Sequence, residues 1–265
     1  MIQLIATDLD GTLLNPGGLT MTERNKKALE LAVSRGVHVV VCTGRLHTGG
    51  LPFALTVPGD VPVVSSNGAV VRLSRSGTYL RRRPMAPELV RELLPMLRQA
   101  GMSPWFYIGD ACWTENYDEG IEALVKRTGS HIEVVADLSR KIPDGPEKIL
   151  GILPAEDTAR LQDRLEKHFA GHLYVTRSMP TQIEVLAADA TKGQALAFVA
   201  ERYGVPKERI AAFGDNFNDL ELFKAAGLKV AMGNAEEPLK AAADIVTDTN
   251  DRSGVAQVIE KLLAE

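Results

Sequence analysis

The chain begins with a short apolar run that ends in two carboxylates, and this feature constrains the fold more than any other. The run Ile2–Ala6 is followed by Thr7 and then by Asp8-Leu9-Asp10-Gly11-Thr12. Such a run is typical of a buried parallel strand, and open α/β sheets bind ligands just beyond the carboxyl ends of these strands. Two acids at that edge repel each other and lose hydration, so a hard cation with a phosphate is the chemistry that favours them there. The alternative is an acidic strand end that continues into an ordinary turn.

The composition excludes several classes of protein. The 265 residues, 45% of them hydrophobic, suffice for one large domain or two modest ones, and the net charge of −4 argues against general nucleic-acid binding. The two cysteines, Cys42 and Cys112, form neither a disulfide framework nor a CxxC metal site, which indicates a reducing compartment. No apolar stretch approaches the roughly 20 residues that cross a bilayer, and the N-terminus begins with the strand pattern, not a signal peptide. We therefore expect a soluble, cytoplasmic protein without nucleic-acid or membrane partners.

The two ends of the chain alternate predicted strands with predicted helices. Near the N-terminus an amphipathic helix over Thr22–Gly36 precedes strands over Val37–Cys42 and Val61–Ser65. The same style returns from Asp189 onward, with helices at 191–203 and 255–263 and strands at 209–213 and 228–232. Strands separated by helices predict right-handed βαβ units and a parallel sheet.

The pattern changes in the middle of the chain, near Arg83-Pro84. A helix over Pro87–Ala100, which Pro95 should kink or end early, is followed by several strands around two further helices. These strands lack the buried parallel pattern, which predicts an α+β unit with an antiparallel sheet. We therefore expect an α/β protein: a Rossmann-like, doubly wound parallel core from residues 1–83 and 187–265, with an inserted α+β domain at 84–186.

Four groups of polar residues fall at the end of a predicted buried strand or at the start of the next helix. They are Asp8 with Asp10, Thr43-Gly44-Arg45, Lys192, and Asp215 with Asn218 and Asp219. In a doubly wound sheet all of them lie at one edge. Lys192 follows the predicted N-cap Thr191, where the helix dipole disfavours a cation by roughly 0.3–1 kcal/mol unless a phosphate is bound beside it.

Together these groups resemble the four motifs of the haloacid dehalogenase superfamily of phosphohydrolases. In chain order the motifs are Asp8-Leu9-Asp10-Gly11-Thr12, Thr43-Gly44-Arg45, Lys192-Gly193 and Gly214-Asp215-Asn216-Phe217-Asn218-Asp219. Four further segments resemble the Cof-type subfamily: Ser66-Asn67-Gly68-Ala69, Thr191-Lys192-Gly193, residues 230–235 and residues 246–250. That subfamily carries a large α/β cap between the second and third motifs, where the insertion lies in this chain.

The resemblance implies a Mg²⁺-dependent phosphatase that works through a phosphoaspartate. Asp8 is the nucleophile, since a carboxylate is ionised at neutral pH and needs no base. Asp10 is the acid that protonates the leaving group and the base that later activates water. The implied metal ligands are the carboxylates of Asp8 and Asp215 and the backbone carbonyl of Asp10, with Asp219 acting through water or another ligand. Phosphate and substrate binding is assigned to Leu9, Thr43, Gly44, Arg45, Lys192 and Asn218.

Other features of the sequence are open to two interpretations. The aromatic residues of the inserted domain, Trp105, Phe106, Tyr107 and Trp113, are expected mainly in its core, and the alternative is that half of them overhang the pocket. The triplet Arg81-Arg82-Arg83 is expected to be a solvated stretch, with steering of anionic substrates as the alternative. His47 is a candidate substrate contact because it follows Arg45 by two residues.

The leading hypothesis is a phosphatase for small metabolites such as sugar phosphates or phosphorylated cofactors, acting as a monomer or homodimer. One alternative is a phosphotransferase of the phosphomannomutase kind, but that requires clustered arginines in the cap, and few occur outside residues 81–83. The other is a non-catalytic sensor of a phosphorylated metabolite, whose signature would be the loss of Asp8 or Asp10. The helix expected after Arg45 contains Gly49-Gly50 and Pro52, so we expect it to be short or distorted.

Overall fold

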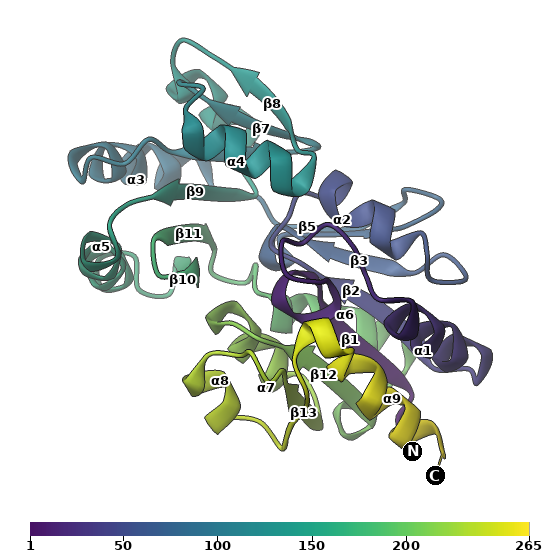
Figure 1. The fold of residues 1–265 in the computed structure, drawn as a ribbon. Coiled ribbons are helices and arrows are strands. Elements are labelled where there is room, and N and C mark those ends of the chain that lie inside the picture. Colours follow the sequence, from purple (N-terminus) through teal and green to yellow (C-terminus); the bar gives the residue numbers. More distant parts are fainter. Residues whose placement is uncertain (265) are drawn as a thin grey trace.

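The computed structural model describes residues 1–264 and contains an eight-stranded and a six-stranded sheet. In Figure 1 the six-stranded sheet lies above the eight-stranded sheet. We call the larger sheet with its helices the core, and the smaller sheet with its helices the cap. The core sheet has the order β14-β13-β12-β1-β2-β3-β4-β5. Its strands are β1 (Leu4–Asp8), β2 (His38–Cys42), β3 (Pro62–Ser65), β4 (Val70–Leu73), β5 (Tyr79–Arg82), β12 (Ile210–Gly214), β13 (Leu228–Ala231) and β14 (Ile245–Val246).

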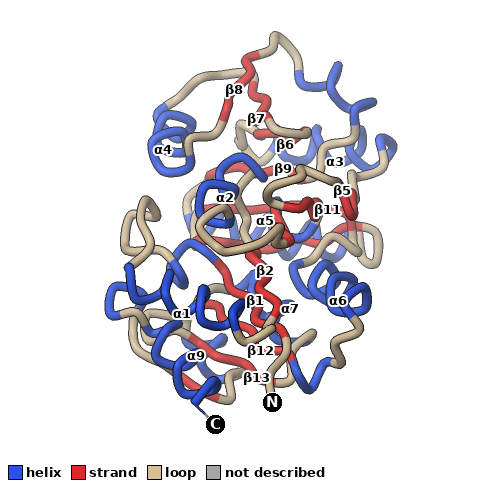
Figure 2. The backbone as a smooth tube through the Cα atoms, turned by 90° about the vertical axis from the view of Figure 1, so that its right-hand side faces the viewer, coloured by secondary structure: helices blue, strands red, loops and turns tan. Residues whose placement is uncertain are grey.

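The core sheet is parallel from β14 to β3, as the sequence predicts. Its central strands β1 and β12 are buried along their whole length, because helices cover both faces. Figure 2 shows α1 and α9 on one side of these strands and α6 with α7 on the other. The core helices are α1 (Glu23–Ser34), α2 (His47–Ala54), α6 (Lys192–Tyr203), α7 (Leu220–Lys224), α8 (Glu237–Ala241) and α9 (Gly254–Ala264).

Two helix starts and one sheet edge bear on the sequence predictions. Helices α1 and α6 begin directly after Thr22 and Thr191, whose hydroxyls each accept a hydrogen bond from a backbone N–H of the first turn. Helix α2 is short, as expected from its glycines and proline. Beyond the turn at Asn67-Gly68, which the sequence indicates between two β-rich runs, β4 and β5 extend the parallel sheet with antiparallel pairing.

The cap sheet has the order β10-β11-β9-β6-β7-β8. It is antiparallel except that β8 pairs with β7 in parallel, because the long connection through α4 returns the chain to the same end. The expectation that α3 ends early at Pro95 is wrong: the helix continues to Gln99, since Pro95 lies on its exposed side. The cap elements are α3 (Pro87–Gln99), β6 (Trp105–Ile108), β7 (Ala111–Thr114), α4 (Glu119–Thr128), β8 (His131–Val134), β9 (Lys148–Ile152), α5 (Ala155–His168), β10 (Leu173–Met179) and β11 (Gln182–Ala187).

The chain passes from the core to the cap after β5 and returns after β11, and the arginine triplet lies at this crossing. Arg81 and Arg83 both bind the carboxylate of Asp189, on the returning segment, and Arg82 binds Glu147. The expectation of a solvated stretch is wrong for Arg81, whose side chain is 7% exposed. The two connecting segments run side by side here, so the arginines tie them together.

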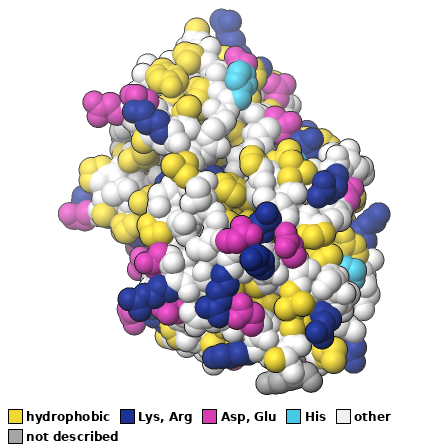
Figure 3. All heavy atoms as spheres, turned by 45° about the vertical axis from the view of Figure 1, so that its right-hand side comes forward, with side chains coloured by type: hydrophobic (Ala, Val, Ile, Leu, Met, Phe, Trp, Pro, Cys, Tyr) yellow, Lys and Arg dark blue, Asp and Glu magenta, His cyan; other side chains and the backbone are white. Residues whose placement is uncertain are grey.

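On the face shown in Figure 3, basic and acidic side chains are interspersed without a continuous basic patch. None of the helices within residues 1–264 combines the length and the apolar character that a bilayer crossing requires.

Candidate active site

The turn after β1 brings the first motif against the end of β12. Gly11 has a φ of 77°, and a Cβ atom at this position would lie 2.2 Å from Oδ2 of Asp215. Only glycine fits such a contact without displacing the acid, and its positive φ is a conformation that other residues rarely adopt. The Gly-Thr turn therefore permits Asp8 and Asp215, which are far apart in the sequence, to lie together.

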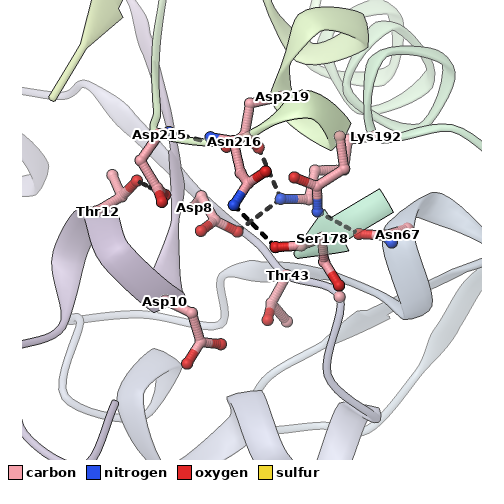
Figure 4. A network of polar contacts seen from close by, with 12 residues as sticks. Asp8, Asp10, Thr12, Thr43, Asn67, Ser178, Lys192, Asp215, Asn216 and Asp219 are labelled. Carbon is pink, nitrogen blue, oxygen red and sulfur yellow. Dashed lines mark hydrogen bonds and ion pairs between the residues drawn. The ribbon is translucent and has the colours of Figure 1, made fainter. Parts of the chain in front are cut away.

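Three buried acids from two strand ends form a cluster around one lysine (Figure 4). Asp8, Asp215 and Asp219 each offer a carboxylate oxygen, and these oxygens all lie within 4.8 Å of one another. Nζ of Lys192 donates to Oδ1 of Asp8 at 2.6 Å and to Oδ1 of Asp219 at 2.7 Å. The predicted position of Lys192 in the first turn of α6 thus places a cation among acids that the sequence assigned to the same edge.

The cluster holds more negative charge than Lys192 neutralises. Burial raises the pKa of Asp8 to about 7 although the Lys192 ammonium opposes the shift. Burial, followed by the charges of Asp8 and Asp219, also raises the pKa of Asp215 well above its usual value. Burial alone would lower the pKa of Lys192, but Asp219 and Asp8 hold it above its usual value. Oxygen ligands with unbalanced negative charge fit a hard divalent cation.

Hydrogen bonds fix two of these acids in place. Oδ2 of Asp219 accepts from the backbone N–H groups of Asp215 and Asn216, at 3.0 and 3.2 Å. Oδ1 of Asp215 accepts from the hydroxyl of Thr12 at 2.7 Å. Both carboxylate oxygens of Asp219 therefore accept hydrogen bonds within the protein, from Lys192 and from the backbone. Asp215 has one oxygen that remains available to a ligand. Thr12 was not predicted to bind Asp215, because its partner lies on a distant strand.

Asp10 lies outside the acid cluster. Its carboxylate accepts two hydrogen bonds from Arg45, from Nε at 2.8 Å and from Nη2 at 2.6 Å. In Figure 4 its side chain turns away from Asp8 and Lys192. The Arg45 guanidinium is 4% exposed and needs an anion, so the pair forms across the cavity floor. Arg45, which the sequence assigned to substrate or phosphate, is occupied by Asp10 in this arrangement.

The second motif and the Asn67 turn form the neighbouring layer. Thr43 is fully buried, and its hydroxyl accepts from the Arg45 backbone N–H at 3.1 Å. Asn218 donates from Nδ2 to Oδ1 of Asn67 at 3.0 Å, whereas Oδ1 of Asn218 is buried and has no partner among residues 1–264. Asn67 belongs to one of the segments that resemble the Cof-type subfamily, but that resemblance did not predict its contact with Asn218.

A buried ion pair on the cap faces this layer. Nζ of Lys148 on β9 donates to Oε2 of Glu184 on β11 at 3.0 Å and to the Gly44 carbonyl at 2.6 Å. Glu184 also accepts from Nδ2 of Asn67 and from the hydroxyl of Ser178. Burial lowers the pKa of Lys148, and Glu184 opposes the shift. Sequence reasoning missed this pair, which joins the cap to the two core loops that border the cluster.

A cavity of about 410 Å³ lies between core and cap. We call its two sides the core wall and the cap wall. Of the predicted site residues, the core wall contains Asp8, Asp10, Gly44, Arg45, Asp215 and Asn218. The predicted residues Leu9, Thr43, Lys192 and Asp219 are buried behind this wall. The charged and polar residues of the cap wall are Tyr107, Arg127, Thr128, Lys148, Ser178, Gln182 and Glu184.

Two other sequence expectations concern residues near the cavity. Trp105 and Phe106 are buried in the cap, as expected, and Tyr107 is buried and also lines the cavity. His47 does not line the cavity: it is buried at the start of α2, and its Nδ1 has no partner within residues 1–264. The expectation that His47 contacts substrate therefore finds no support in its position.

Comparison with known proteins supplies independent information. Residues 5–259 match the model of the haloacid dehalogenase-like hydrolase family. The chain is 31% identical over 259 residues to a 5-amino-6-(5-phospho-D-ribitylamino)uracil phosphatase of Bacillus subtilis, covering 97% of this chain and 94% of the relative. It is 30% identical to a pyridoxal phosphate phosphatase of Escherichia coli, over 97% of each chain. A solved haloacid dehalogenase-like hydrolase from Bacillus subtilis, 30% identical, matches 98% of this chain and 100% of its own with a TM-score of 0.90.

Proposed function

This chain belongs to the haloacid dehalogenase-like hydrolases and is a phosphatase, and we propose that it hydrolyses phosphomonoesters of small metabolites through a phosphoaspartate on Asp8. The observation that carries the proposal is the position of Asp8, which shares the cavity floor with Asp215 and binds Lys192 at 2.6 Å. Lys192 orients the nucleophile and offsets part of the repulsion between its carboxylate and an anionic phosphate.

The residues of the cluster also suit a magnesium ion. Asp8, Asp215 and the backbone carbonyl of Asp10 would hold it, and Asp219 would support the site through its bonds to Lys192 and the backbone. When bound, Mg²⁺ supplies charge neutralisation for the phosphate and for the acids, which Lys192 alone does not balance.

The reaction then proceeds in two displacements at phosphorus. An oxygen of Asp8 forms a bond to phosphorus while the ester bond breaks, and Asp10 gives its proton to the departing alkoxide. Asp10 next takes a proton from a water molecule, which attacks phosphorus, releases inorganic phosphate and restores the Asp8 carboxylate. The cap covers this site and limits the access of bulk water.

The Arg45–Asp10 pair sets a condition on this sequence. Both oxygens of Asp10 accept hydrogen bonds from Arg45, so the carboxylate is held on the guanidinium and is not directed at a leaving group while the pair is intact. We infer that the substrate phosphate competes for Arg45 and that Asp10 becomes available when Arg45 turns to the phosphate. Arg45 thereby serves both the resting pair and the phosphate contact that the sequence predicted.

The size of the cavity supports a small substrate. A volume of about 410 Å³ is enough for a sugar phosphate or a phosphorylated cofactor and too small for a polymer. The relatives named above are phosphatases of a ribitylaminouracil phosphate and of pyridoxal phosphate, which belong to this size class. Arg45 and Arg127 are the arginines among the described residues that line the cavity. With Arg45 assigned to the transferring phosphate, only Arg127 of these two would remain for the second phosphate of a bisphosphate, which does not favour a mutase.

Phosphate release from a panel of sugar phosphates, pyridoxal phosphate and flavin mononucleotide tests the proposal. We expect turnover with Mg²⁺ that disappears with EDTA and in the Asp8→Asn variant, whose thermal unfolding verifies that it is folded. Acid-quenched mass spectrometry of the native chain should show a phosphate adduct on the peptide that contains Asp8. Unchanged turnover in Asp8→Asn would remove Asp8 from its role, and conversion of a hexose 1-phosphate to the 6-phosphate without phosphate release would favour the mutase.

A further inference from the structure

Among the described residues, each charged side chain that lines the cavity belongs to an ion pair or to the acid cluster, with one exception. Asp10 binds Arg45, and Glu184 binds Lys148. Asp8 binds Lys192 behind the wall, and Asp215 belongs to the same acid cluster. The remaining charge is the guanidinium of Arg127, on the cap wall.

Arg127 has no anionic partner. Within residues 1–264 no carboxylate oxygen lies within 4.0 Å of its nitrogen atoms, and its one polar contact is from Nη1 to the sulfur of Met179 at 3.8 Å. Its Nε is buried and finds no hydrogen-bond partner in the part of the chain that the structure describes. A buried N–H donor without a partner is costly, so this site favours a ligand that accepts hydrogen bonds.

The stem of Arg127 crosses toward the core wall. A Cβ atom built on Gly18 would lie 3.7 Å from Cγ of Arg127, which places the arginine beside the loop that follows the first motif. The carbonyl of Gly18 in turn accepts from Arg45 at 2.6 Å. The same Cβ atom would lie 2.6 Å from Oδ1 of Asp10 and 2.7 Å from Nη2 of Arg45. Arg127 therefore lies beside the Arg45–Asp10 pair on the cap wall, where it can meet the part of a bound ester that is remote from Asp8.

A simpler role for Arg127 is to stabilise the C-terminal end of α4, where cations interact favourably with the helix dipole. Its neighbour Lys126 already serves that role: its side chain is 73% exposed and binds Glu122 at 2.7 Å. A residue needed only for the helix end would be solvated in the same way. The cavity-lining position and the buried Nε of Arg127 are not explained by the helix.

We propose that Arg127 binds a carboxylate on the alcohol part of the substrate, so that the preferred substrates are phosphomonoesters of hydroxy acids. The inference rests on the proposed function, since it assumes that the scissile phosphate lies at Asp8. A carboxylate matches the planar guanidinium, which can donate two parallel hydrogen bonds to it. It also carries a single charge, which one arginine balances, whereas a second phosphate carries nearly two.

Two pairs of substrates that differ only in this group test the inference. Phosphoglycerate phosphorylated at carbon 3 carries a carboxylate where glycerol 3-phosphate carries a hydroxymethyl group, and 6-phosphogluconate relates to glucitol 6-phosphate in the same way. Because the pairs differ in length, they sample two separations between phosphate and carboxylate. The measured quantity is the ratio of kcat/KM between the acidic and the neutral member of each pair. A preference for the acidic member in at least one pair supports the inference.

We expect the native enzyme to prefer the acidic member by about tenfold or more, which corresponds to about 1.4 kcal/mol. Arg127→Gln should abolish that preference by lowering kcat/KM for the acidic member to about the value for the neutral member. Arg127→Lys should keep part of the preference. The matched control is Lys126→Gln, which removes the same charge from the same helix end and should leave the ratio unchanged.

Three results would overturn the inference. They are equal kcat/KM for both members of each pair, a preference that survives in Arg127→Gln, and hydrolysis of other phosphate esters but of neither acidic member. Turnover of the neutral esters by the Arg127 variants shows that these variants are folded. Absence of phosphate release from every ester by the native enzyme would reject the proposed function itself, and with it the inference.

Discussion

The two walls of the cavity balance their buried charges in opposite ways. On the core side Asp8, Asp215 and Asp219 share one lysine, and the pKa values of Asp8 and Asp215 are raised. On the cap side Lys148 and Glu184 neutralise each other, and Glu184 accepts further hydrogen bonds from neighbouring side chains. The core wall is thus incomplete without an added cation, whereas the cap wall is complete apart from Arg127.

This difference separates the tasks of the two walls. The unbalanced acids repel one another, and a divalent cation would relieve this repulsion and attract a phosphate, so the core wall is suited to the chemical step. The balanced pair gives the cap wall a fixed shape and a fixed contact with Gly44, so it positions the cap on the core. Cap residues whose hydrogen-bonding groups have no partner in the protein, such as Arg127, are then the ones that can select the substrate.

The largest effect should follow from Asp215→Asn. Loss of this carboxylate removes a proposed metal ligand, and kcat/KM should fall by at least about 10³-fold, or about 4 kcal/mol. The same substitution should make the metal-free protein more stable, because it removes an acid whose charged form is disfavoured, while the amide oxygen can still accept from Thr12. Phosphate release and urea unfolding in EDTA measure the two effects.

The pH dependence sharpens this prediction. The pKa of Asp8 is raised from 3.8 to about 7 on folding, so the folded chain binds more protons than the unfolded chain across that range. The metal-free protein should therefore lose stability as the pH rises from about 4 to about 7, and Mg²⁺ should restore it at the upper end. A metal-free Asp215→Asn variant that is less stable than the native chain, or that retains activity, would show that the core wall is not short of positive charge.

A smaller loss, of at least about 10²-fold in kcat, should follow from Asp10→Asn. With p-nitrophenyl phosphate, whose leaving group needs no proton, the first displacement should survive and the second should be slow. The variant should then release about one p-nitrophenolate per active site in a rapid burst before slow turnover. A uniform slowing without a burst would place Asp10 outside the water-activating step and leave Arg45 as its structural partner only.

On the cap wall the sign of the stability effect should be reversed. Lys148→Met leaves Glu184 buried and unpaired, and the free energy of unfolding should fall by about 3–5 kcal/mol. The double variant Lys148→Met with Glu184→Gln should recover part of this loss, because no uncompensated charge remains. Urea unfolding of the native chain and of both variants measures the difference. A single variant as stable as the native chain would mean that the cap wall, like the core wall, tolerates unpaired charge.

The sequence predicts the core wall better than the cap wall, for a physical reason. Acids at the carboxyl end of a buried strand have no structural purpose, so Asp8 and Asp215 stand out before any contact is known. A lysine or a glutamate in an antiparallel strand looks like an ordinary solvent-facing residue of the alternating pattern. Lys148 and Glu184 are buried only because the cap lies on the core, and no local pattern reports that contact.

The fold follows the same division. The parallel core was predicted because buried strands and capped helices such as α1 and α6 have strong local signals. The parallel pairing of β8 and the added hairpin of β4 with β5 depend on where the sheet edges are free, which is decided by packing. Likewise, that Arg45 binds Asp10 depends on the path of the loops and not on either residue alone.

His47 offers the smallest effect and a third way of treating a buried titratable group, which is to keep it neutral. Burial, helped by the Arg72 charge, lowers the pKa of His47 from 6.5 to about 4. Between about pH 6.5 and pH 4 the imidazole is protonated in the unfolded chain but stays neutral in the folded chain. The free energy of unfolding should therefore be highest above about pH 6.5 and fall by about 1–3 kcal/mol as the pH drops to about 4. His47→Asn should flatten the slope of unfolding free energy against pH in this range. The control is His131→Gln, at a side chain that is 67% exposed, and equal slopes in the two variants would show that His47 is not the group that titrates.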